Sequence, residues 1–177
     1  MPHSFDSELA RIWHKAFDLY RNGNTQAQTF PIEDETKILA AWGMNKIDVF
    51  DYAEDWCIHG EPDLISFVMI HYERWNFFKE EQRGILSSKR LDPTTLPEKS
   101  SEAGGIVWLP RIIPKARAKL RGELPPEVMY GCGGDRHFFF SNNIHPAEFL
   151  RAVRHFENND HAIIQWVLEH RKVSPAI

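Results

Sequence analysis

The spacing of apolar residues predicts a series of helices in the first half of the chain. Apolar side chains recur every three or four positions over residues 5–20, and Asn22-Gly23 is a typical helix stop. The same periodicity predicts helices over 32–42 and 46–58, and a fourth that begins at Pro62 and ends near Gly84. The fourth helix is expected to bury one stripe of side chains, namely Leu64, Val68, His71, Trp75 and Phe78.

The second half of the chain alternates shorter helices with breaks. Pro114 is expected to begin a helix that stops at Gly122, and residues 135–140 form a helical turn. Two more helices are predicted, from Pro146 to about Phe156 and from a cap at Asn159 or Asp160 to about His170. Residues 106–109 and 128–130 could form very short strands.

Residues 85–103 lack any periodicity and form a long connector in the middle of the chain. The connector could separate two subdomains or reach a neighbouring subunit. The pattern as a whole predicts a mostly α fold, a compact multi-helix domain spanning residues 1–177 with a Gly-rich loop. It would comprise a helical N-terminal part (5–84), the connector (85–103) and a second part (104–172).

Composition narrows the class of protein. The 177 residues, 42% hydrophobic and 26% charged, suit one well-buried globular domain. A net charge of −4 argues against nucleic acid or a membrane surface as a partner, and no apolar run is long enough to cross a bilayer. The two cysteines, Cys57 and Cys132, are too few for a disulfide framework or a paired-Cys zinc site. We therefore expect a cytoplasmic protein with free thiols.

Charge is unevenly distributed along the chain. Residues 103–122 contain five basic and no acidic residues, whereas residues 47–63 contain six acidic and no basic ones. The two segments could be solvated faces, or they could pair within or between subunits.

A chemical role for the basic segment is the alternative. If Pro114 is the first helical residue, Lys115 lies in the first turn, where a cation opposes the helix dipole. Together with Arg111 and the free N–H groups of that turn, Lys115 would hold an anion. Trp108 is either a core residue or the wall of a pocket beside this segment.

The Gly-rich loop at 131–134 has no phosphate-loop ending and no dinucleotide-binding pattern, so we expect it to let the backbone approach another group closely. Cys132 precedes the expected helix start, and a helix N-terminus with Arg136 nearby would raise the reactivity of a thiol. His137 could act as a base that Asp135 orients. The simpler interpretations are a small buried thiol for Cys132 and a helix cap for Asp135.

A weaker possibility is a metal site. Asp51, Asp55 and His59 lie four positions apart and share a helix face, which is otherwise a salt-bridged surface. The remaining histidines with an expected structural environment are His71 in the core, His145 as a helix cap, and His155 and His161 at the surface.

Three segments in order resemble one known family: 108–117 (Trp-Leu-Pro-Arg to Lys-Ala-Arg), 122–124 and 130–135 (Tyr-Gly-Cys-Gly-Gly-Asp). The resemblance is to a bacterial family known only as domain of unknown function 5069. It extends from about Leu9 to Trp166, with N-terminal landmarks at Thr29-Phe30, 52–56 and 60–62. It implies a single cytoplasmic, mainly helical domain, and it implies no activity.

Two functions from different classes follow from these features. The first is a cofactor-independent isomerase or lyase acting on a small anionic metabolite. Its substrate-binding residues would be Arg111, Lys115, Trp108 and Arg136, and its catalytic residues Cys132, His137 and Asp135. The second is a non-catalytic binding or scaffolding domain, which could be a homo-oligomer, in which the acidic and basic segments pair.

Overall fold

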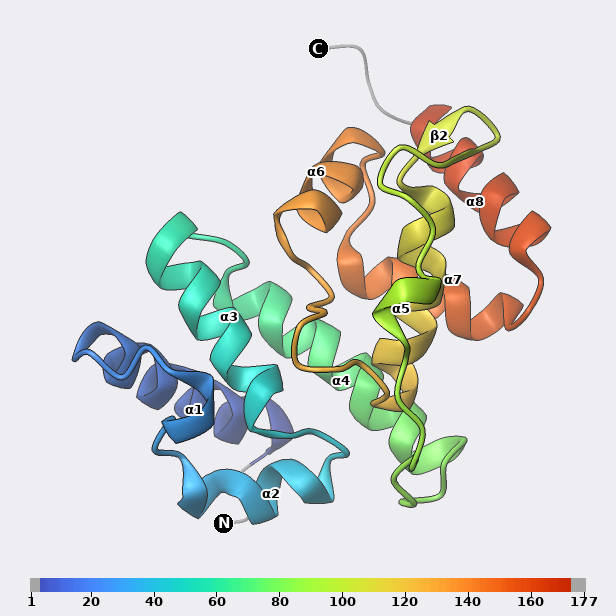
Figure 1. Cartoon of the computed structure of the whole chain (residues 1–177). Coiled ribbons are helices and arrows are strands. Elements are labelled where there is room, and N and C mark those ends of the chain that lie inside the picture. Colours follow the sequence, from blue (N-terminus) through green and yellow to red (C-terminus); the bar gives the residue numbers. More distant parts are fainter. Residues whose placement is uncertain (1–3, 173–177) are drawn as a thin grey trace. The chain divides into compact units, whose positions relative to one another are not determined.

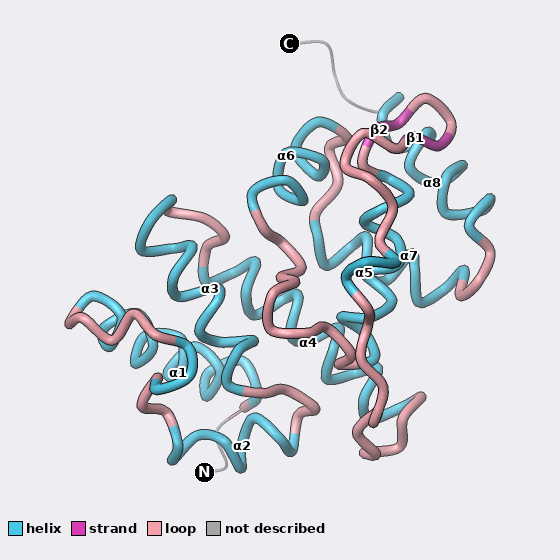
Figure 2. Tube along the Cα trace, in the orientation of Figure 1, coloured by secondary structure: helices cyan, strands magenta, loops and turns pink. Residues whose placement is uncertain are grey.

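The computed structural model describes residues 4–172, and over this range it is mostly α, as predicted. It contains eight α-helices and one two-stranded sheet (Figures 1 and 2). The contacts divide the chain into two compact units, of which the first ends at Leu86 and the second begins at Ser87. The boundary falls at the start of the predicted connector. No described helix is both long and apolar enough to cross a membrane.

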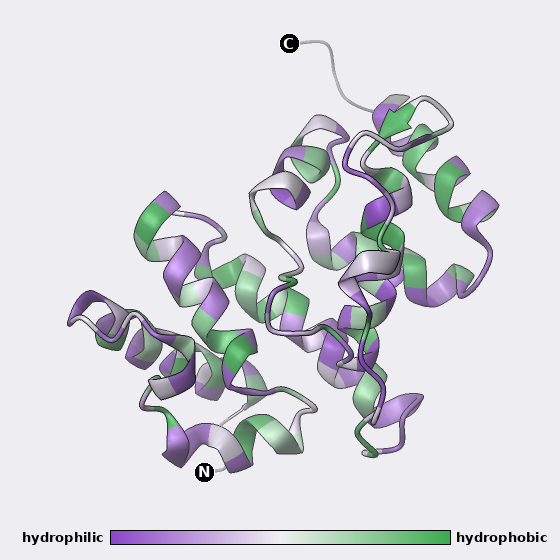
Figure 3. Cartoon of the chain, in the orientation of Figure 1, coloured by the Kyte–Doolittle hydropathy of each residue, from purple (hydrophilic) through white to green (hydrophobic). Residues whose placement is uncertain are grey.

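The N-terminal unit contains four helices: α1 (Phe5–Arg21), α2 (Thr36–Ala41), α3 (Lys46–His59) and α4 (Leu64–Glu80). Helix α1 packs on α3 and α4, and its buried face includes Leu9, Ile12 and Ala16. The predicted ends of α1 and α3 are confirmed, with Gly60 in the left-handed conformation that closes α3. Coloured by hydropathy, α1 alternates apolar and polar residues along the ribbon, as an amphipathic helix does (Figure 3).

Two helix starts in this unit differ from the prediction. The segment expected to be helical from residue 32 opens with a 3-10 turn at Glu33–Glu35 before α2 begins. Pro62 is not the first residue of α4, because the carboxylate of Asp63 accepts the N–H of Ser66 at 2.8 Å and so caps a helix that begins at Leu64.

The buried stripe of α4 also differs from the prediction. His71 and Phe78 are buried as expected, but Leu64, Val68 and Trp75 are only half-buried. The first two turns of α4 carry apolar residues on every side of the helix, so periodicity alone does not identify the buried face. That face is formed by Phe67, Ile70, His71, Arg74 and Phe78. His71 is a hydrogen-bonded core histidine, as predicted, with its Nδ1 2.8 Å from the carbonyl oxygen of Phe67.

The C-terminal unit contains a small sheet and four helices. Strand β1 (Glu102–Ala103) pairs antiparallel with β2 (Ile106–Val107). The helices are α5 (Leu109–Arg121), α6 (Gly133–Ser141), α7 (Pro146–Phe156) and α8 (Asp160–Lys172). Helix α7 packs on both α5 and α8. The core of this unit includes Leu109, Ile112, Ala116, Leu120, Phe138, Phe139, Phe149, Leu150, Val153, Ile163 and Val167.

The predictions for α7 and α8 are confirmed. His145 caps α7, because its Nδ1 accepts the N–H of Ala147 at 3.2 Å, and Asn159 Oδ1 accepts the N–H of Ala162 at 3.1 Å. His155 and His161 are exposed, as expected. Of the two possible strands, the first is confirmed but limited to β2 (residues 106–107), whereas residues 128–130 do not form a strand.

Helix α5 begins at Leu109, five residues earlier than predicted. Pro110, not Pro114, lies in its first turn, and Pro114 lies inside the helix. A proline there removes the hydrogen bond to the carbonyl four residues earlier and crowds that carbonyl, and the packing of α5 on α7 compensates for this cost. Lys115 is therefore well inside the helix, so the expected anion site at its first turn is wrong.

Candidate functional site

A single buried carboxylate ties the Gly-rich loop to α5. Asp135, the third residue of α6, is 0% exposed. Its Oδ2 accepts hydrogen bonds from Lys115 Nζ at 2.5 Å and from the N–H of Gly131 at 2.9 Å, and its Oδ1 accepts one from Trp108 Nε1 at 2.9 Å. The expected N-cap role of Asp135 is wrong, because Cys132 occupies the cap position. The Asp135 side chain instead fixes three separate segments.

Lys115 is the cationic half of this arrangement and is 3% exposed. Its Nζ donates to Asp135 and also lies 3.4 Å from the sulfur of Cys132. A buried charge is tolerated only when it is paired and hydrogen-bonded, and Asp135 provides that pairing. We call Trp108, Lys115, Gly131, Cys132 and Asp135 the buried network.

The glycines of the loop allow the indole of Trp108 to lie against the first turn of α6. A Cβ atom at Gly134 would be 2.4 Å from Cζ2 of Trp108, which is closer than real atoms approach. Gly131 has a φ of 95°, a backbone conformation that residues other than glycine rarely adopt. The expectation that the loop permits a close approach is therefore confirmed, and the approaching group is Trp108 of the same unit.

Trp108 is itself held in a strained backbone conformation. Its φ is 75°, which is uncommon for a bulky residue and costs on the order of 1–3 kcal/mol. Its N–H donates to the carbonyl of Ser101 at 3.0 Å, and its Nε1 donates to Asp135. Strain of this kind is retained where surrounding contacts enforce it, and it is concentrated at functional sites.

The other predicted cations also have partners within the C-terminal unit. Arg111 donates to the carbonyl of Pro97 at 2.6 Å, with its guanidinium 5.8 Å from the centre of the Trp108 ring. Arg136 donates to the carbonyl of Gly131 at 2.8 Å, and Arg117 pairs with Asp160 at 2.5 Å. Most of the basic segment thus stabilises local structure.

Glu123, just after α5, is another acceptor for these cations. Burial alone would raise the pKa of its carboxyl, but hydrogen bonds from Ser87 and Arg121 outweigh that effect and lower the pKa below its usual value. Ser87 Oγ and Arg121 Nε each lie 2.7 Å from the carboxylate. Because Ser87 begins the unit, this contact anchors the start of the connector.

The acidic segment likewise has structural partners in its own N-terminal unit. Asn45 and Asp48 cap α3 reciprocally, and Asp63 caps α4. Tyr20 donates to Glu54 at 3.0 Å. Burial, together with this hydrogen bond, raises the pKa of Tyr20 to about 12.

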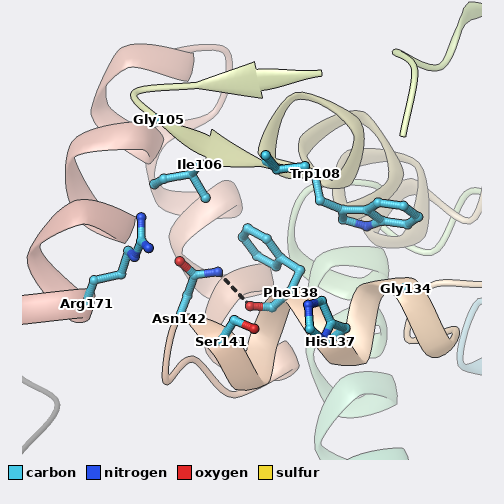
Figure 4. Close-up of a pocket in the computed structure, with 10 residues that line it drawn as sticks. Gly105, Ile106, Trp108, Gly134, His137, Phe138, Ser141, Asn142 and Arg171 are labelled. Carbon is cyan, nitrogen blue, oxygen red and sulfur yellow. Dashed lines mark hydrogen bonds between the residues drawn. The ribbon is translucent and has the colours of Figure 1, made fainter. Parts of the chain in front are cut away.

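A pocket of about 450 Å³ adjoins the buried network and shares Trp108 with it (Figure 4). Its apolar lining includes Ile106 and Phe138. Its polar lining comes from His137, Ser141 and Asn142 at α6 and from Arg171 on α8. Pockets of this size and character, mostly apolar with a few polar groups, are typical of small-molecule sites.

Two of the polar groups around the pocket are ionisable. His137 and Arg171 are both exposed, and neither makes a hydrogen bond or an ion pair within residues 4–172. The guanidinium and the imidazole come from helices far apart in the sequence. In Figure 4 both side chains lie at the rim of the same hollow.

The pocket brings together only part of the predicted site. Trp108 and His137 line it, whereas Cys132, Asp135, Arg111, Lys115 and Arg136 are not among its lining residues. Ser141, Asn142 and Arg171 were missed. Ser141 follows His137 by four positions and so shares its helix face, which is a usable signal, but nothing in the sequence connects Arg171 to α6.

The structure does not support a metal site on the acidic face. Within the described residues, no group of three or more His, Cys, Asp or Glu side chains is arranged to hold a metal ion. His59 is exposed at the end of α3, and Asp51 and Asp55 are half-buried.

Comparison with known proteins supports the family relationship inferred from the motifs. No curated protein and no solved structure matches the chain. The N-terminal landmarks expected for the family lie outside the matched segment. Residues 95–176, which include the buried network and the pocket, match the model of the family described as "Domain of unknown function (DUF5069)".

Proposed function

We propose that the C-terminal unit is a cofactor-independent acid–base enzyme, of the isomerase or lyase type, that acts on a small anionic metabolite in the pocket. The observation that carries this proposal is that a guanidinium, Arg171, and an imidazole, His137, line one largely apolar pocket. Neither side chain has a hydrogen bond or an ion pair with another of the described residues.

Arg171 would bind the anionic group of the substrate. A guanidinium offers planar paired donors that fit a carboxylate or a phosphate. Arg171 takes the place of Lys115 and Arg111 in the sequence-based hypothesis, because those two cations already serve Asp135 and the Pro97 carbonyl.

His137 would transfer the proton. Neutral imidazole can remove a proton from the carbon next to a carboxylate, leaving a carbanion whose charge the carboxylate and Arg171 stabilise. Where the substrate has a carbon–carbon double bond beside that carbon, the carbanion is delocalised over it, and the imidazolium returns the proton to the far end of the double bond. The double bond thereby moves, which is an isomerisation. Alternatively the imidazolium protonates a departing hydroxyl, which leaves as water and completes a lyase reaction.

The buried network would position this chemistry. Asp135 fixes the Trp108 indole, which forms one wall of the pocket, and Lys115 neutralises Asp135. Cys132 remains an alternative proton donor on the network side. A cytoplasmic location is part of the proposal and fits the two free thiols.

A thermal-shift screen of small carboxylates, sugar acids and phosphates on the full chain tests the binding step. A ligand that binds only the folded protein raises the midpoint. The shift should disappear in Arg171→Gln and persist in Arg151→Gln, an exposed arginine outside the pocket. A shift that survives Arg171→Gln would contradict the proposed role of Arg171.

Proton NMR in D₂O tests the catalytic step on any ligand that the screen identifies. Wild-type protein should exchange a carbon-bound proton of the ligand for deuterium, and His137→Gln should bind the ligand without exchanging it. His155→Gln, another exposed histidine, should behave as wild type. Binding without exchange in the wild type would favour the second function, a non-catalytic binding or scaffolding domain.

A further inference from the structure

One buried oxygen in the wall of the pocket has no hydrogen-bond partner. Asn142, at the end of α6, is 4% exposed and lines the pocket. Its Nδ2 donates to the carbonyl of Phe138 at 2.6 Å, but within the described residues its Oδ1 accepts nothing. Figure 4 shows this oxygen on the side of the amide that faces Ile106 and Arg171.

The amide orientation is fixed by its neighbour. Exchanging the oxygen and nitrogen of Asn142 would bring Oδ1 against the carbonyl oxygen of Phe138, and two acceptors repel each other. The unpaired group is therefore an acceptor. Leaving a buried acceptor unpaired is costly, and native proteins seldom do so without a reason.

The neighbours of this oxygen indicate what would pair with it. Ser141 also lines the pocket, its hydroxyl has no hydrogen-bond partner within residues 4–172, and Arg171 supplies the positive charge. An anionic group on Arg171 would leave the rest of a ligand facing one pure acceptor and one hydroxyl. Only a ligand with its own hydrogen-bond donor can pair with the Asn142 oxygen in that wall.

We infer that the pocket selects hydroxylated anions, meaning small hydroxycarboxylates or sugar phosphates, with Asn142 Oδ1 accepting a hydrogen bond from a ligand hydroxyl. The inference rests on the proposed anion site. A ligand without the hydroxyl would leave the acceptor unpaired in the complex, and such sites reject the deoxygenated analogue strongly. Asn142 is thus a specificity-determining residue.

The test compares two pairs of probes on the full chain by calorimetry or NMR titration at millimolar concentration. Gluconate and hexanoate have the same chain length and charge but differ in hydroxyl groups, and glycerol 3-phosphate and propyl phosphate form the corresponding phosphate pair. We expect the hydroxylated member of at least one pair to bind about tenfold more tightly or better. The pair that binds identifies the anionic group.

Two variants test whether Asn142 causes the preference for hydroxylated probes. Asn142→Leu keeps the branched shape of the side chain and removes the acceptor, together with the Nδ2 donor to Phe138, so the preference should fall to about onefold. Ser141→Ala, at an exposed position, should fold normally and reduce the preference only in part. If Asn142→Leu does not fold, the comparison of probes on wild type still decides whether the pocket selects hydroxyl groups.

The outcomes separate the inference from the proposed function. If the two members bind equally in every pair that binds to wild type, the inference is overturned and the anion site stands. A preference that is undiminished in Asn142→Leu also overturns it. If no probe of either pair binds, the anion site and the inference fail together.

Discussion

The buried network and the pocket share Trp108, but the polar groups of the network have hydrogen-bond partners and, among the described residues, several of those in the pocket do not. In the network, both carboxylate oxygens of Asp135 have donors and Lys115 has two acceptors. In the pocket, the guanidinium of Arg171 and the Oδ1 of Asn142 have no partner among the described residues. The hydrogen bonds of the buried network fix the local structure, whereas the polar groups of the pocket are left to interact with a ligand.

The contrast also explains why the Gly-rich loop, the most conspicuous motif in the sequence, resembles a reactive centre. The loop at 131–134 concentrates a thiol, a carboxylate and glycines, which suggests a reactive centre. Most of its unusual features serve the close approach of Trp108 and the pairing of Lys115. The groups available for chemistry are the less conspicuous ones on α6 and α8.

The largest expected effect comes from breaking the network. Lys115→Met leaves the carboxylate of Asp135 buried without its cation, so we expect a loss of about 3–5 kcal/mol in the free energy of unfolding. Chemical denaturation measures this loss. Arg117 lies on α5 like Lys115 and pairs with the exposed Asp160 at the start of α8, so Arg117→Met should cost about 1 kcal/mol or less. Similar losses for both variants would mean that the network is no more important than a surface pair.

A smaller effect is expected from filling the space under the indole. Gly134→Ala places a Cβ 2.4 Å from Trp108, and relieving that overlap should cost about 1–3 kcal/mol. Because Trp108 would have to move, ligand binding should weaken as well. Gly133→Ala is the matched control, since a Cβ there meets only the end of Arg136 at 3.8 Å. A variant at Gly134 as stable as its control would show that the indole does not need this approach.

The Glu123 carboxylate should give a pH-dependent effect. Its pKa is lowered on folding, so its charged form contributes stability above the unfolded value of 4.5, and that contribution is lost as the pH falls through the folded pKa. Glu123→Gln should cost about 1 kcal/mol at neutral pH, because solvent screens part of the pair with Arg121. Denaturation curves of the two proteins should converge in acid, and a constant difference down to low pH would contradict the assignment.

The smallest effect on stability is expected in the pocket. Arg171→Gln and His137→Gln should each change the free energy of unfolding by less than about 0.5 kcal/mol, since neither exposed side chain has a partner within the described residues. Thermal or chemical denaturation in the absence of ligand checks this. A large loss of unfolding free energy in either variant would show that the residue stabilises the fold and is not free to bind a ligand.

Sequence reasoning recovered most of the helices and the close-approach role of the Gly-rich loop. It failed where local signals compete, as at Pro110 and Pro114, because two prolines four residues apart both fit a helix start. It also failed at α4, where nearly continuous apolar residues hide the inner face. Both failures are failures of local pattern.

The site was only partly predictable for a different reason. Trp108 and His137 were identified because aromatic and imidazole groups beside a glycine loop are conspicuous. Arg171 lies 34 positions after His137, and its place in the pocket depends on how α8 packs on α7. Lys115 is paired with Asp135 through a tertiary contact, and the spacing of residues in the sequence does not reveal such a contact.

The sharing of one carboxylate by three segments constrains how this chain can vary. Asp135 serves a lysine on α5, an indole before α5 and a backbone N–H in the loop, so no replacement at that position suits all three donors. A viable lineage would have to change lysine and aspartate together, with the tryptophan accommodated at the same time. Variation among related chains should therefore accumulate at the rim of the pocket, where exchanging the exposed Ser141 or His137 does not endanger the fold.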